Sequence, residues 1–312
     1  MLVQNSEAGM RIVLVGGTGF IGRAMVQAWA PQHQVVVLTR EVAKARERLP
    51  EAVECVQWDG QTLGEWVAAL EGVDGLVNLA GEPIAQRWTP AVKQRLRQSR
   101  VQPTRLLMEA IGQLRTPPTT LLQASAIGIY DQNPTLEVDE TSPPGKGFLA
   151  ELGVEWEEAA RPAESAGVRV CWMRIGIVLG RGGGALEKML PAFRVGLGGP
   201  IGSGRQWLSW IHLDDVVGAA MFLLERPDLT GAFNFTAPHP VTMNEFARTL
   251  AKVLERPALV RVPGFALRML LGEMAEAVLQ GSRVLPRRLL ETGYLFRYPE
   301  LEAALKEVLA SR

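Results

Sequence analysis

The sequence predicts an α/β protein built on a doubly wound parallel sheet of the Rossmann type. Strand-like and helix-like stretches alternate through the first two-thirds of the chain. The strand-like stretches are short and almost entirely apolar, as strands buried on both faces are. A glycine-rich turn follows the first of them. We expect a flexible leader at 1–10, a dinucleotide-binding domain at 11–180, and a smaller, mostly helical substrate lobe at 181–312 that returns some segments to the first domain.

β-branched and apolar runs mark the strands, and prolines or glycines end the helices. The first helix stops at Pro31, and Pro117-Pro118 breaks the long helix before the fifth strand. Strands are expected at 11–15, 35–39, 53–58, 76–79, 121–125 and 169–175, with helices at 20–30, 42–49, 63–70, 90–114 and 148–166. Beyond Gly180 we expect helices at 185–195, 214–224 and 243–254, a strand at 233–236, and a mostly helical tail from residue 263.

The charge balance argues against a nucleic-acid partner. Lys plus Arg and Asp plus Glu number 33 each among 312 residues, and nucleic-acid binding depends on an excess of cationic contacts. Three scattered histidines predict no metal site, and Cys55 and Cys171 are expected to be free thiols in a reducing compartment. No apolar run approaches the roughly 20 residues that span a bilayer. We therefore expect a cytoplasmic protein with no membrane partner.

The loop from Gly16 to Gly22 carries the strongest functional signal. Gly16 allows the sharp turn out of the strand, Gly19 allows a pyrophosphate to approach the backbone, and Gly22 allows the helix to pack on the sheet. A turn that binds nothing is the alternative, but a strand before the loop and a helix after it favour a cofactor. The loop residues expected at the cofactor are Gly16, Thr18, Gly19, Phe20, Ile21 and Gly22.

The end of the second strand predicts NADP rather than NAD. An acidic residue at this point would bind the ribose 2′-hydroxyl, but the sequence has Thr39 and Arg40, and Glu41 comes one residue late. The Arg40 guanidinium can bind a 2′-phosphate with two parallel hydrogen bonds. A solvated surface arginine is the alternative.

The GxxGxxG spacing and further motifs resemble the extended short-chain dehydrogenase/reductase family, which includes nucleotide-sugar epimerases. The matching positions are Asp59, the stretch 78–81, Thr104, Ser125 to Tyr130, and Trp210 to Asp215. The resemblance implies cofactor contacts at Asp59, Leu79, Ala80, Gly81 and Ser125.

An atypical branch of that family, usually labelled epimerase family protein, is closer still. Leu79-Ala80-Gly81-Glu82-Pro83-Ile84 and the glycine- and tryptophan-rich stretch 197–212 look like that branch, which carries a C-terminal extension of unknown role. We expect the substrate at Glu82, Trp207, Trp210 and His212, although core packing for the tryptophans and a structural role for His212 are alternatives. The resemblance names no substrate. It allows a homodimer through the helices at 90–114 and 148–166.

One departure separates this chain from the family. The family's catalytic Tyr-x-x-x-Lys pair is replaced by Phe148 and Leu152. The remaining catalytic candidates are Ser125 and Tyr130. We therefore expect an NADP-dependent oxidoreductase or epimerase-like enzyme acting on an unidentified small molecule; the alternative is a non-catalytic NADP-binding protein that regulates or scaffolds a partner.

Overall fold

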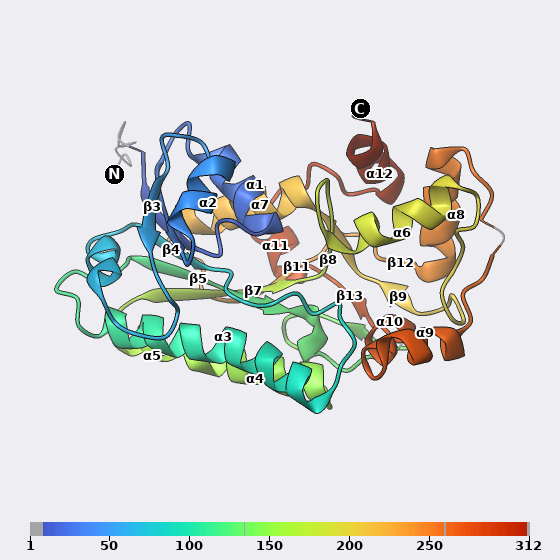
Figure 1. The fold of residues 1–312 in the computed structure, drawn as a ribbon, viewed down its shortest axis with the longest axis horizontal. Coiled ribbons are helices and arrows are strands. Elements are labelled where there is room, and N and C mark those ends of the chain that lie inside the picture. The colour runs from blue at the N-terminus through green and yellow to red at the C-terminus, as the bar shows by residue number, and fades with distance from the viewer. Residues whose placement is uncertain (1–8, 134, 259, 311–312) are drawn as a thin grey trace.

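A parallel sheet of seven strands forms the centre of the protein (Figure 1). The computed structural model describes residues 9–133, 135–258 and 260–310. Within the sheet the strand order is β11-β7-β5-β4-β1-β2-β3, and every neighbouring pair is parallel. The strands are β1 (Arg11–Val15), β2 (Gln34–Thr39), β3 (Glu54–Gln57), β4 (Gly75–Asn78), β5 (Thr120–Ala126), β7 (Arg169–Ile175) and β11 (Gly231–Phe235). The doubly wound fold is confirmed.

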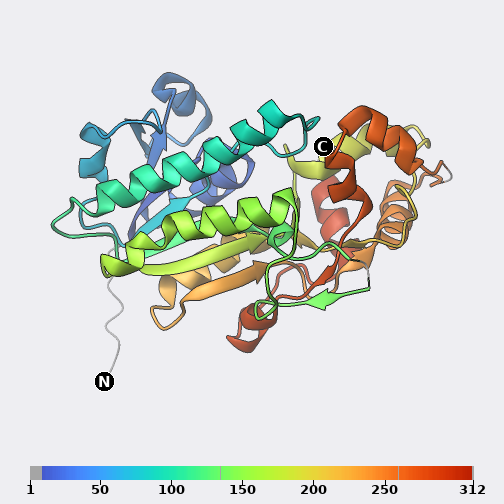
Figure 2. The same cartoon turned by 90° about the horizontal axis from the view of Figure 1, so that it is seen from below.

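Helices cover both faces of this sheet. One face packs on α1 (Phe20–Trp29), α2 (Val42–Arg48) and α7 (Leu213–Glu225). The other packs on the 3-10 helix η1 (Glu65–Leu70), α3 (Pro90–Ile111), α4 (Phe148–Ala160) and α5 (Pro162–Ser165). Figure 2 shows α3 and α4 running side by side across the face of the sheet that is turned toward the viewer. Two apolar cores result, one on each side of the strands.

The helix expected at 148–166 is divided in two. Pro162 cannot donate a backbone hydrogen bond, so it occupies the first position of α5, and α4 ends at Ala160. The structure also contains a short 3-10 turn η2 (Ile127–Ile129) directly after β5.

The C-terminal lobe has its own core and three two-stranded sheets. The pairs are β8 (Ile177–Leu179) with β10 (Trp210–His212), β9 (Trp207–Leu208) with β12 (Val241–Thr242), and β6 (Glu137–Val138) with β13 (Arg283–Val284). The helices are α6 (Gly184–Arg194), α8 (Met243–Leu254), α9 (Gly264–Leu271), α10 (Met274–Leu279), α11 (Arg287–Glu291) and α12 (Leu301–Leu309). Strand β11 and helix α7 return to the large sheet.

The expected leader falls mostly outside the described residues, which begin at Gly9. Met10 donates its backbone N–H to His33 Nδ1 at 3.1 Å. Cys55 and Cys171 are both free. Among the described helices, none is long and apolar enough to cross a membrane.

Candidate cofactor site

A cavity of about 600 Å³ opens where the strand order reverses beside β1. In doubly wound sheets this crevice, at the carboxyl ends of the strands, is where ligands bind. The loops after β1, β2, β3 and β4 line it together with one face of α3. Its lining comprises Val15, Gly16, Thr18, Gly19, Leu38, Thr39, Arg40, Glu41, Trp58, Asp59, Gly60, Gln61, Leu79, Ala80, Gly81, Glu82, Pro83, Arg95, Gln98, Ser99, Gln102 and Pro103.

The glycine loop has the geometry of a phosphate cradle. Gly16 turns the chain with a φ of +82°, and Gly19 donates its N–H to the Gly16 carbonyl at 3.0 Å. A Cβ at Gly22 would lie 2.3 Å from the Gly16 oxygen, so Gly22 is required by packing. A Cβ at Gly19 would meet only that oxygen, at 3.3 Å, and otherwise faces open space.

Helix α1 begins directly at this open space. Its N-cap residue is Gly19, which has no side chain, and its first turn contains no acidic residue. The free N–H groups and the positive end of the helix dipole therefore remain available for an anion. Gly16, Thr18 and Gly19 line the cavity. The Phe20 ring instead packs against Gly183, so closely that a Cβ at Gly183 would lie 2.6 Å from it.

Arg40 and Asp59 lie on the wall formed by the ends of β2 and β3. Arg40 is exposed, and its carbonyl accepts a hydrogen bond from Gln57 Nε2 at 2.9 Å. Glu41 is engaged with Lys44 at 2.6 Å. The Asp59 carboxylate accepts hydrogen bonds from the Thr62 hydroxyl and from two backbone N–H groups, which lower its pKa to about 2. Asp59 thus shapes the cavity wall as a charged turn residue.

Two buried residues at this cavity were not predicted. Trp58 is 5% exposed, lines the cavity and packs on Trp66 with ring centroids 5.5 Å apart. Arg100 lies behind Gly81, and its Nη2 donates to the Glu82 carbonyl at 2.8 Å. Burial lowers the Arg100 pKa to about 10. In the sequence, Trp58 looks like a core residue of a strand and Arg100 like a solvated residue of a helix. Nothing in the sequence therefore indicated that either lies at a binding cavity.

The loop after β4 leads from the cavity to the C-terminal lobe. The Glu82 N–H donates to Ser99 Oγ at 3.1 Å, and the carboxylate of this half-exposed residue lies 3.7 Å from Arg95. Further along, Lys188 of α6 donates to the Ala85 carbonyl at 2.9 Å. The loop that follows the cavity is therefore hydrogen-bonded to α6 of the C-terminal lobe.

The positions of the family's Tyr–Lys pair are packed with apolar side chains. Phe148 lies at the start of α4 and contacts Trp88 from the loop after β4. Leu152, one turn later, is 3% exposed. Neither side chain can donate or accept a proton.

The two catalytic candidates belong to a buried polar network on the α4 side of the sheet. Ser125 Oγ donates to Glu157 at 2.7 Å, and Glu157 forms an ion pair with Arg174 at 2.8 Å. Tyr130 Oη donates to Asn234 at 2.7 Å and accepts from Arg174 at 2.9 Å. Burial raises the Tyr130 pKa to about 12. Neither candidate lines the 600 Å³ cavity, and their catalytic role stays a prediction.

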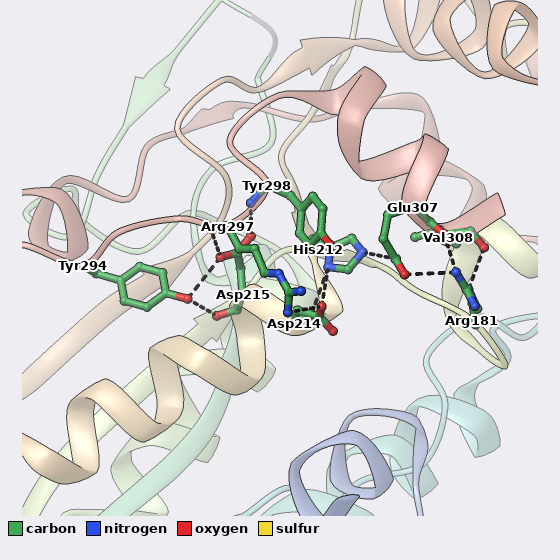
Figure 3. A network of polar contacts seen from close by, with 9 residues as sticks. All are labelled: Arg181, His212, Asp214, Asp215, Tyr294, Arg297, Tyr298, Glu307 and Val308. Atoms are coloured by element: carbon green, nitrogen blue, oxygen red, sulfur yellow. Dashed lines mark hydrogen bonds and ion pairs between the residues drawn. The ribbon is translucent and has the colours of Figure 1, made fainter. Parts of the chain in front are cut away.

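His212 joins the N-terminus of α7 to α12 (Figure 3). Its Nδ1 accepts the Asp214 N–H at 3.1 Å, so Nε2 carries the proton that it shares with Glu307 at 2.9 Å. Glu307 also pairs with Arg181 at 3.0 Å, and the Tyr298 ring lies 4.0 Å from the imidazole. His212 is 2% exposed, and these contacts fit the structural alternative.

The remaining expected substrate residues occupy different environments. Trp210 is fully buried in the lobe core, and its Nε1 donates to the His239 carbonyl at 3.1 Å. Trp207 is partly exposed beneath the Arg283 guanidinium, 5.3 Å from the ring centroid. The structure thus separates Trp210 and His212 from the cavity that Glu82 lines.

The reversed strand order and the glycine cradle define a Rossmann dinucleotide-binding protein. The chain belongs to the NAD dependent epimerase/dehydratase family, whose model matches residues 12–235. A second model, a domain of unknown function named DUF1731, matches residues 262–308. This confirms the resemblance drawn from the motifs, including the C-terminal extension.

Relatives of known sequence and structure cover nearly the whole chain. The chloroplastic epimerase family protein SDR39U1 homolog of Arabidopsis thaliana is 42% identical over 97% of this chain and 88% of its own. Epimerase family protein SDR39U1 of Mus musculus is 41% identical over 96% of this chain and 100% of its own. The crystal structure of human SDR39U1 (isoform 2) with NADPH is 38% identical, covers 97% of this chain and 100% of that one, and superposes with a TM-score of 0.87.

Proposed function

We propose that this protein binds NADP(H) in the 600 Å³ cavity and acts as an oxidoreductase or epimerase-like enzyme on a small molecule. The observation that carries the cofactor choice is the end of β2. Arg40 lines the cavity there, while Glu41, the next residue along the chain, pairs with Lys44. A guanidinium favours a 2′-phosphate, whereas NAD-specific sites place a carboxylate at this point. The human relative crystallised with NADPH supports the same choice.

The residues of the cavity fit the parts of such a cofactor. The open space at Gly19 and the N-terminus of α1 suit the pyrophosphate, and Arg40 suits the 2′-phosphate. Trp58 and Asp59 line the part of the cavity that suits the adenine, and the backbone of Leu79 to Gly81 lines the part that leads toward the nicotinamide end. When bound, the nicotinamide supplies hydride transfer. The chain's own residues bind and orient it.

The site lacks an evident side chain for proton transfer among the family's catalytic positions. Phe148 and Leu152 hold no proton, and the hydroxyls of Ser125 and Tyr130 are engaged in buried hydrogen bonds. A reaction at this site would need a proton donor from the substrate, from water or from another side chain. The same packing favours a second candidate function, a non-catalytic protein that uses NADP(H) occupancy to regulate or scaffold a partner.

Two measurements separate these candidates. Calorimetry with NADPH and NADH tests the cofactor. NADPH oxidation with a panel of aldehydes and ketones, and product analysis of nucleotide sugars incubated with NADP⁺, test the chemistry. Tight NADPH binding with turnover of one panel member supports the enzyme. Tight binding with no turnover in either assay favours the non-catalytic protein, and failure to bind NADPH contradicts both.

A further inference from the structure

Two segments of the C-terminal lobe contain cations and no acidic residue. Residues 188–213 and 256–272 include no Asp or Glu, although the whole chain has equal numbers of acidic and basic residues. Their cations are Lys188, Arg194, Arg205, Arg256, Arg261 and Arg268. Nine large apolar side chains are exposed among the described residues, and most lie in these two segments: Val195, Leu197, Val260, Phe265, Met269 and Leu270. Charge and apolar exposure are therefore concentrated together.

The two segments are neighbours in space. Ile201 and Val262 form a parallel bridge, and the Gly202 N–H donates to the Val262 carbonyl at 2.9 Å. Arg256 Nε donates to the Arg194 carbonyl at 3.1 Å. In Figure 1 the chain that leaves α6 and the chain that enters α9 meet at the outer edge of the C-terminal lobe. We call the exposed surface of residues 194–205, 256–258 and 260–270 the basic apolar face.

Helix α9 supplies most of the apolar side chains of this face. Phe265, Met269 and Leu270 are 66%, 72% and 69% exposed, and no residue of the helix is buried. Its single charged residue, Arg268, pairs with Glu276 at 2.7 Å. Contiguous exposed apolar patches of this kind mark interaction sites in soluble proteins.

We propose that the basic apolar face binds the surface of an anionic lipid bilayer. Arginines near such a surface are attracted to acidic headgroups, and apolar side chains beside them insert at the boundary of the acyl chains. Contact with the surface requires no spanning segment, so it agrees with the absence of a spanning helix among the described residues. The expected absence of a membrane partner rested on the lack of a spanning segment, which contact with a bilayer surface does not require.

Other partners fit the face less well. A second copy joined through the same face would bring arginines against arginines across a two-fold axis. A nucleic acid would pair the arginines but offers no apolar environment to Phe265 and Met269. An anionic bilayer satisfies both kinds of side chain.

Two of the arginines are free to make this contact. Arg194 and Arg205 are exposed, and among the described residues their side chains form no hydrogen bond or ion pair. Each arginine that reaches an anionic surface raises the partition coefficient about fivefold. Two such residues therefore account for about 25-fold.

The test is flotation of the full chain with vesicles of phosphatidylcholine alone or with about one-third phosphatidylglycerol. Arg194→Glu/Arg205→Glu reverses the charge at two positions of the face, and Phe265→Ser/Met269→Ser removes the apolar anchor. The matched control is Arg105→Glu/Leu295→Ser, because both residues are exposed and lie outside the face. Thermal melting confirms that each variant is folded, and size exclusion measures the oligomeric state of each.

We expect binding to the anionic vesicles only, and its loss in 0.5 M NaCl. The charge variant should partition at least about 25-fold more weakly and the apolar variant at least about tenfold more weakly, with the control unchanged. The proposal is overturned if the unmodified chain ignores anionic vesicles, or if the face variants bind as well as the control. A change of oligomeric state in the face variants without loss of lipid binding would assign the face to self-association instead.

Discussion

Phe148 lies edge-on against Trp88, with ring centroids 5.0 Å apart and ring planes at 75°. Trp88 is 8% exposed and donates its backbone N–H to the Leu271 carbonyl at 3.3 Å. The position at which the family resemblance implies a proton-donating tyrosine is thus an aromatic contact that connects α4, the loop after β4 and the C-terminal extension. At this position Phe148 contributes to packing and cannot transfer a proton.

The first prediction follows from this contact. The unmodified protein should reduce simple ketones with NADPH, and epimerise UDP-glucose in the presence of NADP⁺, only at background rates, because positioned acid–base groups typically contribute 10²- to 10⁴-fold in rate. Absorbance at 340 nm measures the ketone reduction, and product analysis measures the epimerisation, which consumes no cofactor. Robust turnover would show that another group supplies the proton.

Restoring the family pair tests the same site from the other side. Phe148→Tyr/Leu152→Lys should give weak activity at most, and it should lower the melting temperature because Leu152 is 3% exposed and the new ammonium would be buried. Phe148→Tyr alone is the matched control for packing. A stable double variant with high turnover would contradict this account.

Arg40 is predicted to set the cofactor preference. A charge-assisted contact with the 2′-phosphate contributes about 1.5–3 kcal/mol, which is roughly 10- to 150-fold in affinity. NADPH should bind at least tenfold more tightly than NADH by calorimetry, and Arg40→Ala should remove most of that difference. Arg46→Ala, an exposed cation that does not line the cavity, should leave it unchanged. Equal affinities in the unmodified protein would refute the assignment.

Substitutions at two glycines of the cradle should have different effects, one on NADPH binding and the other on stability. Gly19 has φ −76° and ψ 178°, a conformation open to any residue, so Gly19→Val should fold and lose NADPH binding. Gly22→Ala should be destabilised by about 1–3 kcal/mol because its Cβ would lie 2.3 Å from the Gly16 oxygen. Thermal melting with and without NADPH distinguishes the two effects. Undiminished stabilisation of the Gly19 variant by NADPH would move the binding site elsewhere.

Alkaline stability should depend on Cys171. Burial raises the pKa of this thiol from 9.0 to about 11. A raised pKa in the folded state contributes stability that is complete below pH 9 and is lost as the pH rises toward 11, at up to about 1.4 kcal/mol per pH unit. Urea unfolding from pH 8 to 11 should show this loss in the unmodified chain and a shallower one in Cys171→Ala. If the free energy of unfolding falls equally with pH in both proteins, the loss of stability comes from a group other than Cys171.

The long strands could be predicted because each is a continuous apolar run, and the glycine loop because its spacing has a geometric cause. Strand β6 could not, since its partner β13 lies 146 residues further along the chain. Side-chain direction at the end of β5 could not be derived from the motif. Ser125 and Ala126 point to opposite faces of the sheet: Ser125 is hydrogen-bonded to Glu157, and Ala126 is exposed.

Asp215 joins the start of α7 to the C-terminal extension. This fully buried carboxylate at the start of α7 accepts hydrogen bonds from the Tyr294 hydroxyl and from the backbone N–H groups of Arg297 and Tyr298, about eighty residues later. Without residues 294–298 this carboxylate would lack three of its hydrogen-bond donors. We therefore expect the packing around the start of α7 to be complete only when the C-terminal extension is present. A nascent chain arrested before residue 290 should be protease-sensitive although its whole glycine cradle has emerged.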